Sequence, residues 1–280
     1  YSVVYTDRSL NHMSDSFQNV MNDVSSSLKE VYNAEAVVLV PGGGTYAMEA
    51  VARQFATDQS CLVLRNGWFS FRWSQIFEMG NIPSQEMVLK ARRISEDSQS
   101  PFAPPDINEV VELIKKKKPH MVFAPHVETS SGIILPDDYI RSIAAAVHSV
   151  GGMFVLDCIA SGAIWVDMQD CGVDVLISAP QKGWSASPAF GMVMLSSDAA
   201  DKINETKSTS FSCDLLKWLQ IMQAYENGGH AYHATMPTDA IKHFRDTVNE
   251  TAEFGFDNAR KKQQELGDKV RALLQRYNIN

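Results

Sequence analysis

The amino-acid sequence predicts an α/β fold in which a mostly parallel central sheet carries helices on both faces. Short apolar segments of strand length recur along the chain, and segments with helical periodicity lie between most of them. The apolar segments are continuous, as expected for strands of a parallel sheet that is covered on both sides. The 280 residues, of which 45% are hydrophobic, suffice for one large domain or one domain and part of a second.

The first predicted element is a helix from about Ser14 to Tyr32, because its apolar residues recur at steps of three and four. Apolar segments predict strands at 36–40, 61–64, 87–89, 120–123, 153–156, 173–177 and 192–195. Between them, helices are expected from the glycine turn to Phe55, from the turn at 66–67 to Met79, and at 106–118 and 137–150.

The segment from Arg92 to Pro105 is polar and contains proline, so we expect a loop. Asp106 with Glu109 is typical of a capping box that opens the next helix. Near the C-terminus, residues 248–277 contain no proline and predict one long helix with a break at Gly255 or Gly267.

Charge and composition exclude several classes of function. The net charge is −8, which is unfavourable for binding a nucleic-acid backbone. No stretch of 18 apolar residues occurs, so no membrane span is expected. The four cysteines are scattered, which predicts neither a disulfide framework nor a metal site. The opening Tyr-Ser-Val-Val does not resemble a signal peptide, so we expect a cytoplasmic protein.

Polar residues follow most of the predicted strands. In an open parallel sheet the carboxyl ends of the strands form one edge, where ligands bind. The residues expected there are Gly42, Gly43, Gly44, Thr45, Asn66, Gly67, Trp68, Phe69, His126, Glu128, Thr129, Ser130, Asp157, Ser178, Gln181 and Lys182. Their convergence predicts a site at this edge.

The glycine run between the first strand and its helix allows two interpretations besides a plain structural turn. Backbone N–H groups and the helix N-terminus can bind a phosphate there. Gly42, Gly44 and Ala47 also satisfy a loose dinucleotide fingerprint, and Arg65 after the second strand could hold a ribose 2′-phosphate. An NADP-dependent dehydrogenase is therefore an alternative.

Asp157 and Lys182 favour a different chemistry. A carboxylate at the end of an apolar strand is costly unless a cation meets it. A lysine in a desolvated polar cluster becomes a nucleophile toward aldehydes, and an aspartate beside a pyridine nitrogen keeps that nitrogen protonated. Asp157 or Lys182 alone is more readily explained by a structural role. The two together, after a glycine loop, are better explained by a catalytic site.

With these residues the sequence resembles the pyridoxal-phosphate-dependent class V aminotransferases, in particular the alanine–glyoxylate and serine–pyruvate branch. The resemblance extends from about His12 to Thr238. It is carried by Pro41-Gly-Gly-Gly-Thr-Tyr-Ala-Met-Glu-Ala50, Asn66-Gly-Trp-Phe-Ser-Phe-Arg72, His126-Val-Glu-Thr-Ser-Ser-Gly132, Val155-Leu-Asp-Cys-Ile-Ala-Ser161 and Ser178-Ala-Pro-Gln-Lys-Gly183. The fold that it implies is the large domain of fold type I.

The resemblance implies a role for each matched position. Lys182 forms the Schiff base with pyridoxal 5′-phosphate and shuttles a proton, so that Lys182 and Asp157 are the catalytic residues. Asp157 binds the pyridine nitrogen, Phe69 and Ile159 lie on the two ring faces, and Thr129 reaches the phenolic oxygen. The phosphate is held by Gly43, Gly44, Thr45 and Gln181, and by Tyr232 and Thr235 of the neighbouring subunit.

By the same resemblance, the protein is a homodimeric transaminase with active sites shared across the interface. It moves an amino group from alanine or serine to glyoxylate or pyruvate in a ping-pong reaction. Residues 1–245 are then the cofactor-binding domain, and 246–280 lead toward a small C-terminal domain that carries the substrate-binding arginine. That arginine is missing here, so a longer protein is expected; a non-catalytic cofactor-binding or dimerisation module is the other alternative.

Overall fold

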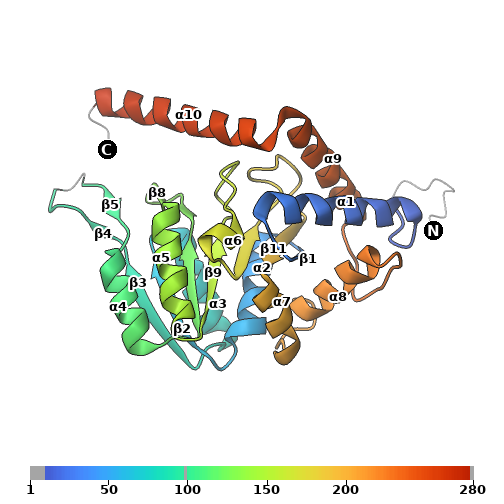
Figure 1. Cartoon of the computed structure of the whole chain (residues 1–280), viewed down its shortest axis with the longest axis horizontal. Helices are drawn as coiled ribbons and strands as arrows, with labels where there is room; N and C mark the ends of the chain where they lie inside the picture. The colour runs from blue at the N-terminus through green and yellow to red at the C-terminus, as the bar shows by residue number, and fades with distance from the viewer. Residues whose placement is uncertain (1–9, 98–99, 278–280) are drawn as a thin grey trace.

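The computed structural model describes residues 10–97 and 100–277 and has a seven-stranded sheet at its centre (Figure 1). In spatial order the strands are β1 (Ala36–Pro41), β11 (Phe190–Leu195), β10 (Val175–Ser178), β9 (Met153–Asp157), β6 (Met121–Pro125), β2 (Ser60–Arg65) and β3 (Gln85–Lys90). β11 is antiparallel to both of its neighbours, and the other pairs are parallel. The predicted α/β fold with a mostly parallel sheet is confirmed.

Helices cover both faces of this sheet. The α-helices are α1 (Asp15–Tyr32), α2 (Gly44–Val51), α3 (Trp68–Gly80), α4 (Ile107–Lys117), α5 (Asp137–His148), α6 (Met168–Cys171), α7 (Ser197–Lys202), α8 (Leu215–Glu226), α9 (Thr238–Phe254) and α10 (Phe256–Arg276). A π-helical turn, Ala52–Ala56, continues α2, and a 3-10 turn, Ile203–Glu205, follows α7. In Figure 1, α5 lies in front of the sheet, whereas α2 and α3 lie behind it.

The first helix shows why the periodicity was informative. The side chains of Phe17, Met21, Val24 and Leu28 are buried on one face of α1, as the spacing predicts. Ser14 caps the helix, because its hydroxyl oxygen accepts a hydrogen bond of 3.2 Å from the Phe17 N–H. Burial of one apolar face against α8, α9 and the sheet therefore fixes where this helix packs, and the Ser14 cap fixes where it begins.

The polar segment 92–105 is more ordered than the loop that composition predicts. Within it, β4 (Arg92–Arg93) and β5 (Phe102–Ala103) pair as a short antiparallel hairpin. Asp106 caps α4 through the Asn108 N–H at 2.8 Å, but the predicted capping box is incomplete. The carboxylate of Glu109 instead binds the Arg92 guanidinium at 2.7 and 3.0 Å.

Other short elements were not predicted. β7 (Val127–Glu128) and β8 (Ile133–Ile134) form a second small hairpin, and each is too short to show a period. Helices α7 and α8 occupy part of the stretch after β11, where no element was expected. The broad apolar face of α8, which includes Trp218 and Met222, is buried.

The break between the two C-terminal helices falls at one of the two predicted glycines. Gly255, with a φ of 93°, separates α9 from α10. Gly267 lies inside α10 and does not interrupt it. No residue of α10 is buried, and the helix lies along the top of the molecule in Figure 1.

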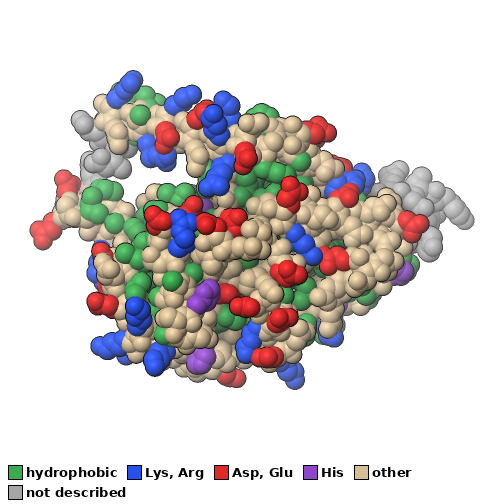
Figure 2. Space-filling view, in the orientation of Figure 1, with side chains coloured by type: hydrophobic (Ala, Val, Ile, Leu, Met, Phe, Trp, Pro, Cys, Tyr) green, Lys and Arg blue, Asp and Glu red, His purple; other side chains and the backbone are tan. Residues whose placement is uncertain are grey.

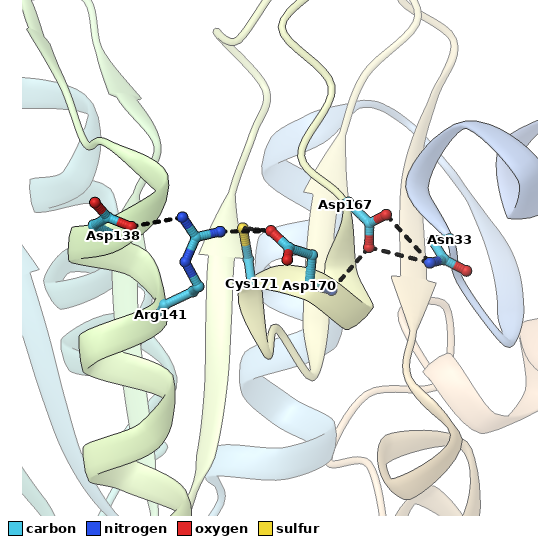
Figure 3. A network of polar contacts seen from close by, with 6 residues as sticks. All are labelled: Asn33, Asp138, Arg141, Asp167, Asp170 and Cys171. Atoms are coloured by element: carbon cyan, nitrogen blue, oxygen red, sulfur yellow. Dashed lines mark hydrogen bonds and ion pairs between the residues drawn. The ribbon is translucent and has the colours of Figure 1, made fainter.

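A polar network joins the helices on the front face (Figure 3). The Arg141 guanidinium of α5 binds Asp138 at 2.6 Å and Asp170 of α6 at 2.5 Å. Asp167, which caps α6, accepts hydrogen bonds of 3.2 Å from the Asn33 side chain just after α1. The network connects three helices that are distant in sequence.

The surface carries charges of both signs, which Figure 2 shows spread over one face of the molecule and along α10. In the part of the chain that the structure describes, none of the helices combines the length and hydropathy needed to cross a membrane. The four cysteines are buried and unpaired. The opening Tyr-Ser-Val-Val lies outside the described residues.

Candidate active site

The residues that follow the parallel strands meet at one edge of the sheet, where they surround a cavity of about 180 Å³. The cavity is lined by Gly44, Thr45, Met48, Phe69, Arg72, Val127, Thr129, Asp157, Ile159, Ala160, Gln181 and Lys182. Parallel strands bring their carboxyl ends to the same edge, so residues from five separate loops come together. Eight of the eleven residues that the family resemblance assigns to the cofactor line this one cavity.

The glycine loop presents the N-terminus of α2 to the cavity. Gly43 is the N-cap of α2, and no side chain caps the helix there. A Cβ atom on Gly44 would come within 2.6 Å of Ile159 Cδ1, so a larger residue here would require the Ile159 side chain to move. The free backbone N–H groups and the helix dipole make this end of the cavity suited to an anion.

The N-terminus of α3, in contrast, is already occupied by a carboxylate of the protein. Glu128 is fully buried and accepts hydrogen bonds from the backbone N–H groups of Phe69 and Ser70, at 3.2 and 2.8 Å. The hydroxyls of Ser70 and Ser130 donate to it at 2.7 and 2.6 Å. Glu128 thereby holds the start of α3 and positions Phe69 on the cavity wall.

Hydrogen bonding keeps Glu128 ionised. Burial by itself would raise the pKa of this carboxyl, but the hydrogen bonds from Ser130, Ser70 and Phe69 outweigh it and hold the pKa below its ordinary value. The sequence placed Glu128 at the correct edge of the sheet without indicating this capping role.

Asp157 ends β9 and is the anionic residue of the cavity lining. Burial raises its pKa to about 6, which the hydrogen bond from the Ile159 N–H and the charge of Arg72 partly oppose. The Ile159 N–H donates to Oδ1 at 2.9 Å. A buried carboxylate with so few partners is poised to meet a cationic or N–H group of a ligand.

The buried charge of Asp157 predicts a pH-dependent difference in stability. Without ligand, Asp157→Asn is expected to be about 3 kcal/mol more stable than the wild type at pH 8, because the folded-state pKa of about 6 lies above the ordinary 3.8. The difference should shrink as the pH falls below 6 and be only about 0.5 kcal/mol at pH 4, where the folded carboxyl is protonated and the unfolded one is still partly ionised. Urea unfolding of both proteins at pH 8 and pH 4 measures it, and an equal difference at the two pH values would contradict this prediction.

Lys182 lies in the turn after β10 and lines the cavity. The lysine is exposed in the protein without ligand, so it is not desolvated as the sequence analysis expected. Next to it, the side-chain oxygen of Gln181 is buried and has no hydrogen-bond partner in the described protein. Buried amide groups are normally satisfied, so this group is available to a ligand.

Arg72 is a cavity residue that the sequence analysis did not single out. Its Nη1 donates to the Thr45 hydroxyl at 3.2 Å, and its Cζ lies 5.6 Å from the centre of the Phe69 ring. With Lys182 it supplies the positive charge of the cavity lining. The signal was its position one helical turn after Phe69, which places both side chains on the same face of α3.

The other three residues assigned to the cofactor do not line the cavity, and neither do the remaining residues expected at this edge, Gly42, Asn66, Gly67, Trp68, His126, Glu128, Ser130 and Ser178. Gly43 lies beside it as the cap of α2. Tyr232 and Thr235 are exposed, and the Tyr232 ring lies 5.7 Å from that of His12. Within one chain, the loop that carries these two residues is thus separate from the cavity.

The strand order argues against a dinucleotide site of the Rossmann type. Such a site requires the first two strands to be neighbours, but β11, β10, β9 and β6 separate β1 from β2. Arg65 stacks on Phe71 at 4.6 Å and donates to Ser74, away from the glycine loop. The described residues also contain no cluster of three or more histidine, cysteine or acidic residues that could hold a metal ion.

Comparisons with known proteins agree with this architecture. The family model described as aminotransferase class V matches residues 2–279. An alanine–glyoxylate aminotransferase of Rattus norvegicus is 25% identical over 264 residues, 92% of this chain and 60% of the relative. A 2-aminoethylphosphonate–pyruvate transaminase of Lysinibacillus sphaericus is 26% identical over 253 residues, 88% of this chain and 64% of the relative.

A solved structure is similar as well. The alanine–glyoxylate aminotransferase of Nostoc sp. superposes with a TM-score of 0.81 at 22% identity, over 95% of this chain and 68% of that one. At this identity the superposition shows the shared fold. The chain spans about 60% of the length of the curated alanine–glyoxylate relatives that it matches.

Proposed function

Because the chain belongs to the class V aminotransferase family, we propose that it binds pyridoxal 5′-phosphate and transfers amino groups between small molecules. The donor is an amino acid of the alanine or serine type, and the acceptor is a 2-oxo acid of the glyoxylate or pyruvate type. The name of the rat relative, an alanine–glyoxylate aminotransferase, supports this substrate class. The observation that carries the proposal is that Lys182, Asp157 and the open N-terminus of α2 line one cavity.

The residues present fit this cofactor. When bound, pyridoxal phosphate supplies an aldehyde and a pyridine ring that withdraws electrons from the substrate. Gly43, Gly44 and Thr45 would bind its phosphate at the helix N-terminus, and the Gln181 side chain, which lines the same cavity, would donate to it through Nε2. Asp157 holds the proton at the ring nitrogen.

The cavity walls supply the remaining contacts. Phe69 and Ile159 pack against the ring, and the Thr129 hydroxyl binds its phenolic oxygen. Lys182 anchors the aldehyde end through Nζ and, when released, moves a proton at that nitrogen to and from the substrate carbon. Two half-reactions that share one amine carrier require ping-pong kinetics, so initial-rate plots with two substrates should give parallel lines.

The assembly and the domain boundaries are part of the same proposal. Tyr232 and Thr235 are exposed and lie outside the cavity of their own chain, which supports a homodimer in which each reaches the partner's phosphate site.

We propose residues 1–245 as the cofactor-binding domain and 246–280 as a connection to a small C-terminal domain. In support, α10 has no buried residue although apolar Leu266, Val270 and Leu273 recur along it. The buried, unpaired cysteines support a cytoplasmic location.

The test is the visible absorption spectrum of the purified protein after addition of pyridoxal phosphate, followed by borohydride reduction and peptide mapping. A yellow band and a label on the peptide with Lys182 are expected. Absence of the band, or a label on another lysine, would overturn the proposal. If the band forms but neither alanine nor serine changes it, the chain is a cofactor-binding module without transaminase activity.

Arg72 is expected to contribute to phosphate binding. Arg72→Gln should weaken binding of pyridoxal phosphate about tenfold, because a guanidinium beside the phosphate cradle is lost. Binding of pyridoxal, which has no phosphate, should stay unchanged. Equilibrium titrations with the two compounds measure this, and Arg65→Gln, outside the cavity, is the control. Equal weakening of both compounds would show that Arg72 acts on the fold of the pocket instead.

A further inference from the structure

The loop that follows β9, residues 158–164, lies between α10 and the segment that carries Lys182. A Cβ atom on Gly162 would come within 2.4 Å of the Gln263 side chain of α10. On the other side, a Cβ atom on Gly183 would come within 2.1 Å of the Gly162 carbonyl oxygen. The backbone at Gly162 is thus in close contact with Gln263 and with the residue next to Lys182.

Gln263 holds this loop with both ends of its amide. Its Nε2 donates to the Ser161 carbonyl oxygen at 3.1 Å, and its Oε1 accepts from the Ala163 N–H at 2.6 Å. At the start of the same helix, the Phe256 ring packs 5.6 Å from that of Trp165 and 6.2 Å from that of Trp184. These contacts dock the first half of α10 on the site edge of the molecule.

The loop that Gln263 holds forms part of the cavity wall. Ile159 and Ala160 line the cavity, and the Ile159 N–H donates to Asp157. The Ser161 hydroxyl lies 2.7 Å from Nδ1 of the buried His126, which follows β6. A displacement of the loop would therefore move one wall of the cavity and remove the support behind Gly183.

We propose that Gln263 is a positioning residue that holds the loop 158–164 against Gly183 and thereby positions Lys182 in the cavity. The consequence for Lys182 chemistry rests on the proposed function. Two hydrogen bonds to backbone groups are enough to select one loop conformation, and reactive groups displaced by about 1 Å lose much of their rate. A helix that is otherwise exposed is thus connected to the reactive amine.

The test compares Gln263→Ala with Gln264→Ala, which removes the same side chain from an exposed neighbouring position of α10. In the protein without cofactor, hydrogen–deuterium exchange is measured in peptides that contain residues 158–164 and 179–185. Gln263→Ala should exchange about tenfold faster in both peptides, and Gln264→Ala should match the wild type. Unchanged exchange at 179–185 in Gln263→Ala would overturn the inference.

A second measurement follows the consequence for Lys182. On mixing with pyridoxal phosphate, the absorption band of the Lys182-linked cofactor should form about tenfold more slowly in Gln263→Ala than in Gln264→Ala, at a similar thermal midpoint. Equal rates would refute the positioning role even if the loop exchanges faster. If the wild type forms no band, the proposed function fails, and the exchange at 179–185 alone decides whether Gln263 supports the lysine segment.

Discussion

Replacement of Lys182 by alanine is expected to lower the transamination rate by at least about 10⁴-fold, because in the proposed function this one amine both anchors the cofactor and moves the proton. Lys182→Arg should lose as much activity, since a guanidinium keeps the charge but does not release its proton. The measurement is kcat/KM with alanine and glyoxylate, together with borohydride labelling of each variant.

Two controls make this result specific. Lys202→Ala changes a surface lysine that pairs with Glu205 and does not line the cavity, and it should leave the rate unchanged. Circular dichroism and thermal unfolding should show that both Lys182 variants remain folded, because this side chain is exposed and makes no ion pair with the residues that the structure describes. A Lys182→Ala protein that kept more than a tenth of the activity would refute the assigned role.

Replacement of Glu128 by alanine is expected to have the largest effect on stability, with a decrease of about 3 kcal/mol in the free energy of unfolding. The change leaves the N–H groups of Phe69 and Ser70 and two serine hydroxyls without their buried acceptor. It also removes the negative charge from the N-terminus of α3. Urea unfolding at pH 7 measures the effect.

The exposed Glu112 on α4 provides a matched control, because Glu112→Ala removes the same side chain from a position with little burial. That variant should change stability by less than about 0.5 kcal/mol. Glu128→Gln should be destabilised as well, since its amide group directs N–H donors at groups that are themselves donors. A loss below about 1 kcal/mol in Glu128→Ala would mean that other acceptors replace the carboxylate.

Much of the site followed from the order of residues along the chain. Polar or glycine residues follow most of the apolar strand segments, and parallel strands share one carboxyl edge, so Gly44, Asp157 and Lys182 were expected to meet there. Their side-chain chemistry, an open helix N-terminus, an acid and an amine, indicated the kind of ligand. These inferences need only local periodicity and one general rule of sheet construction.

The remaining features depend on contacts between distant segments, which local sequence patterns do not specify. Periodicity reports that a position is buried but not what covers it, so it did not reveal that β11 runs antiparallel or that Glu128 caps α3. In the same way, Arg72 and Gln263 read as ordinary polar positions on helices. Composition and spacing thus determined the fold class and brought forward the candidate reactive residues. Only the tertiary structure decided which side chains hold them in place, because hydrogen bonds between loops distant in sequence depend on where the sheet brings those loops together.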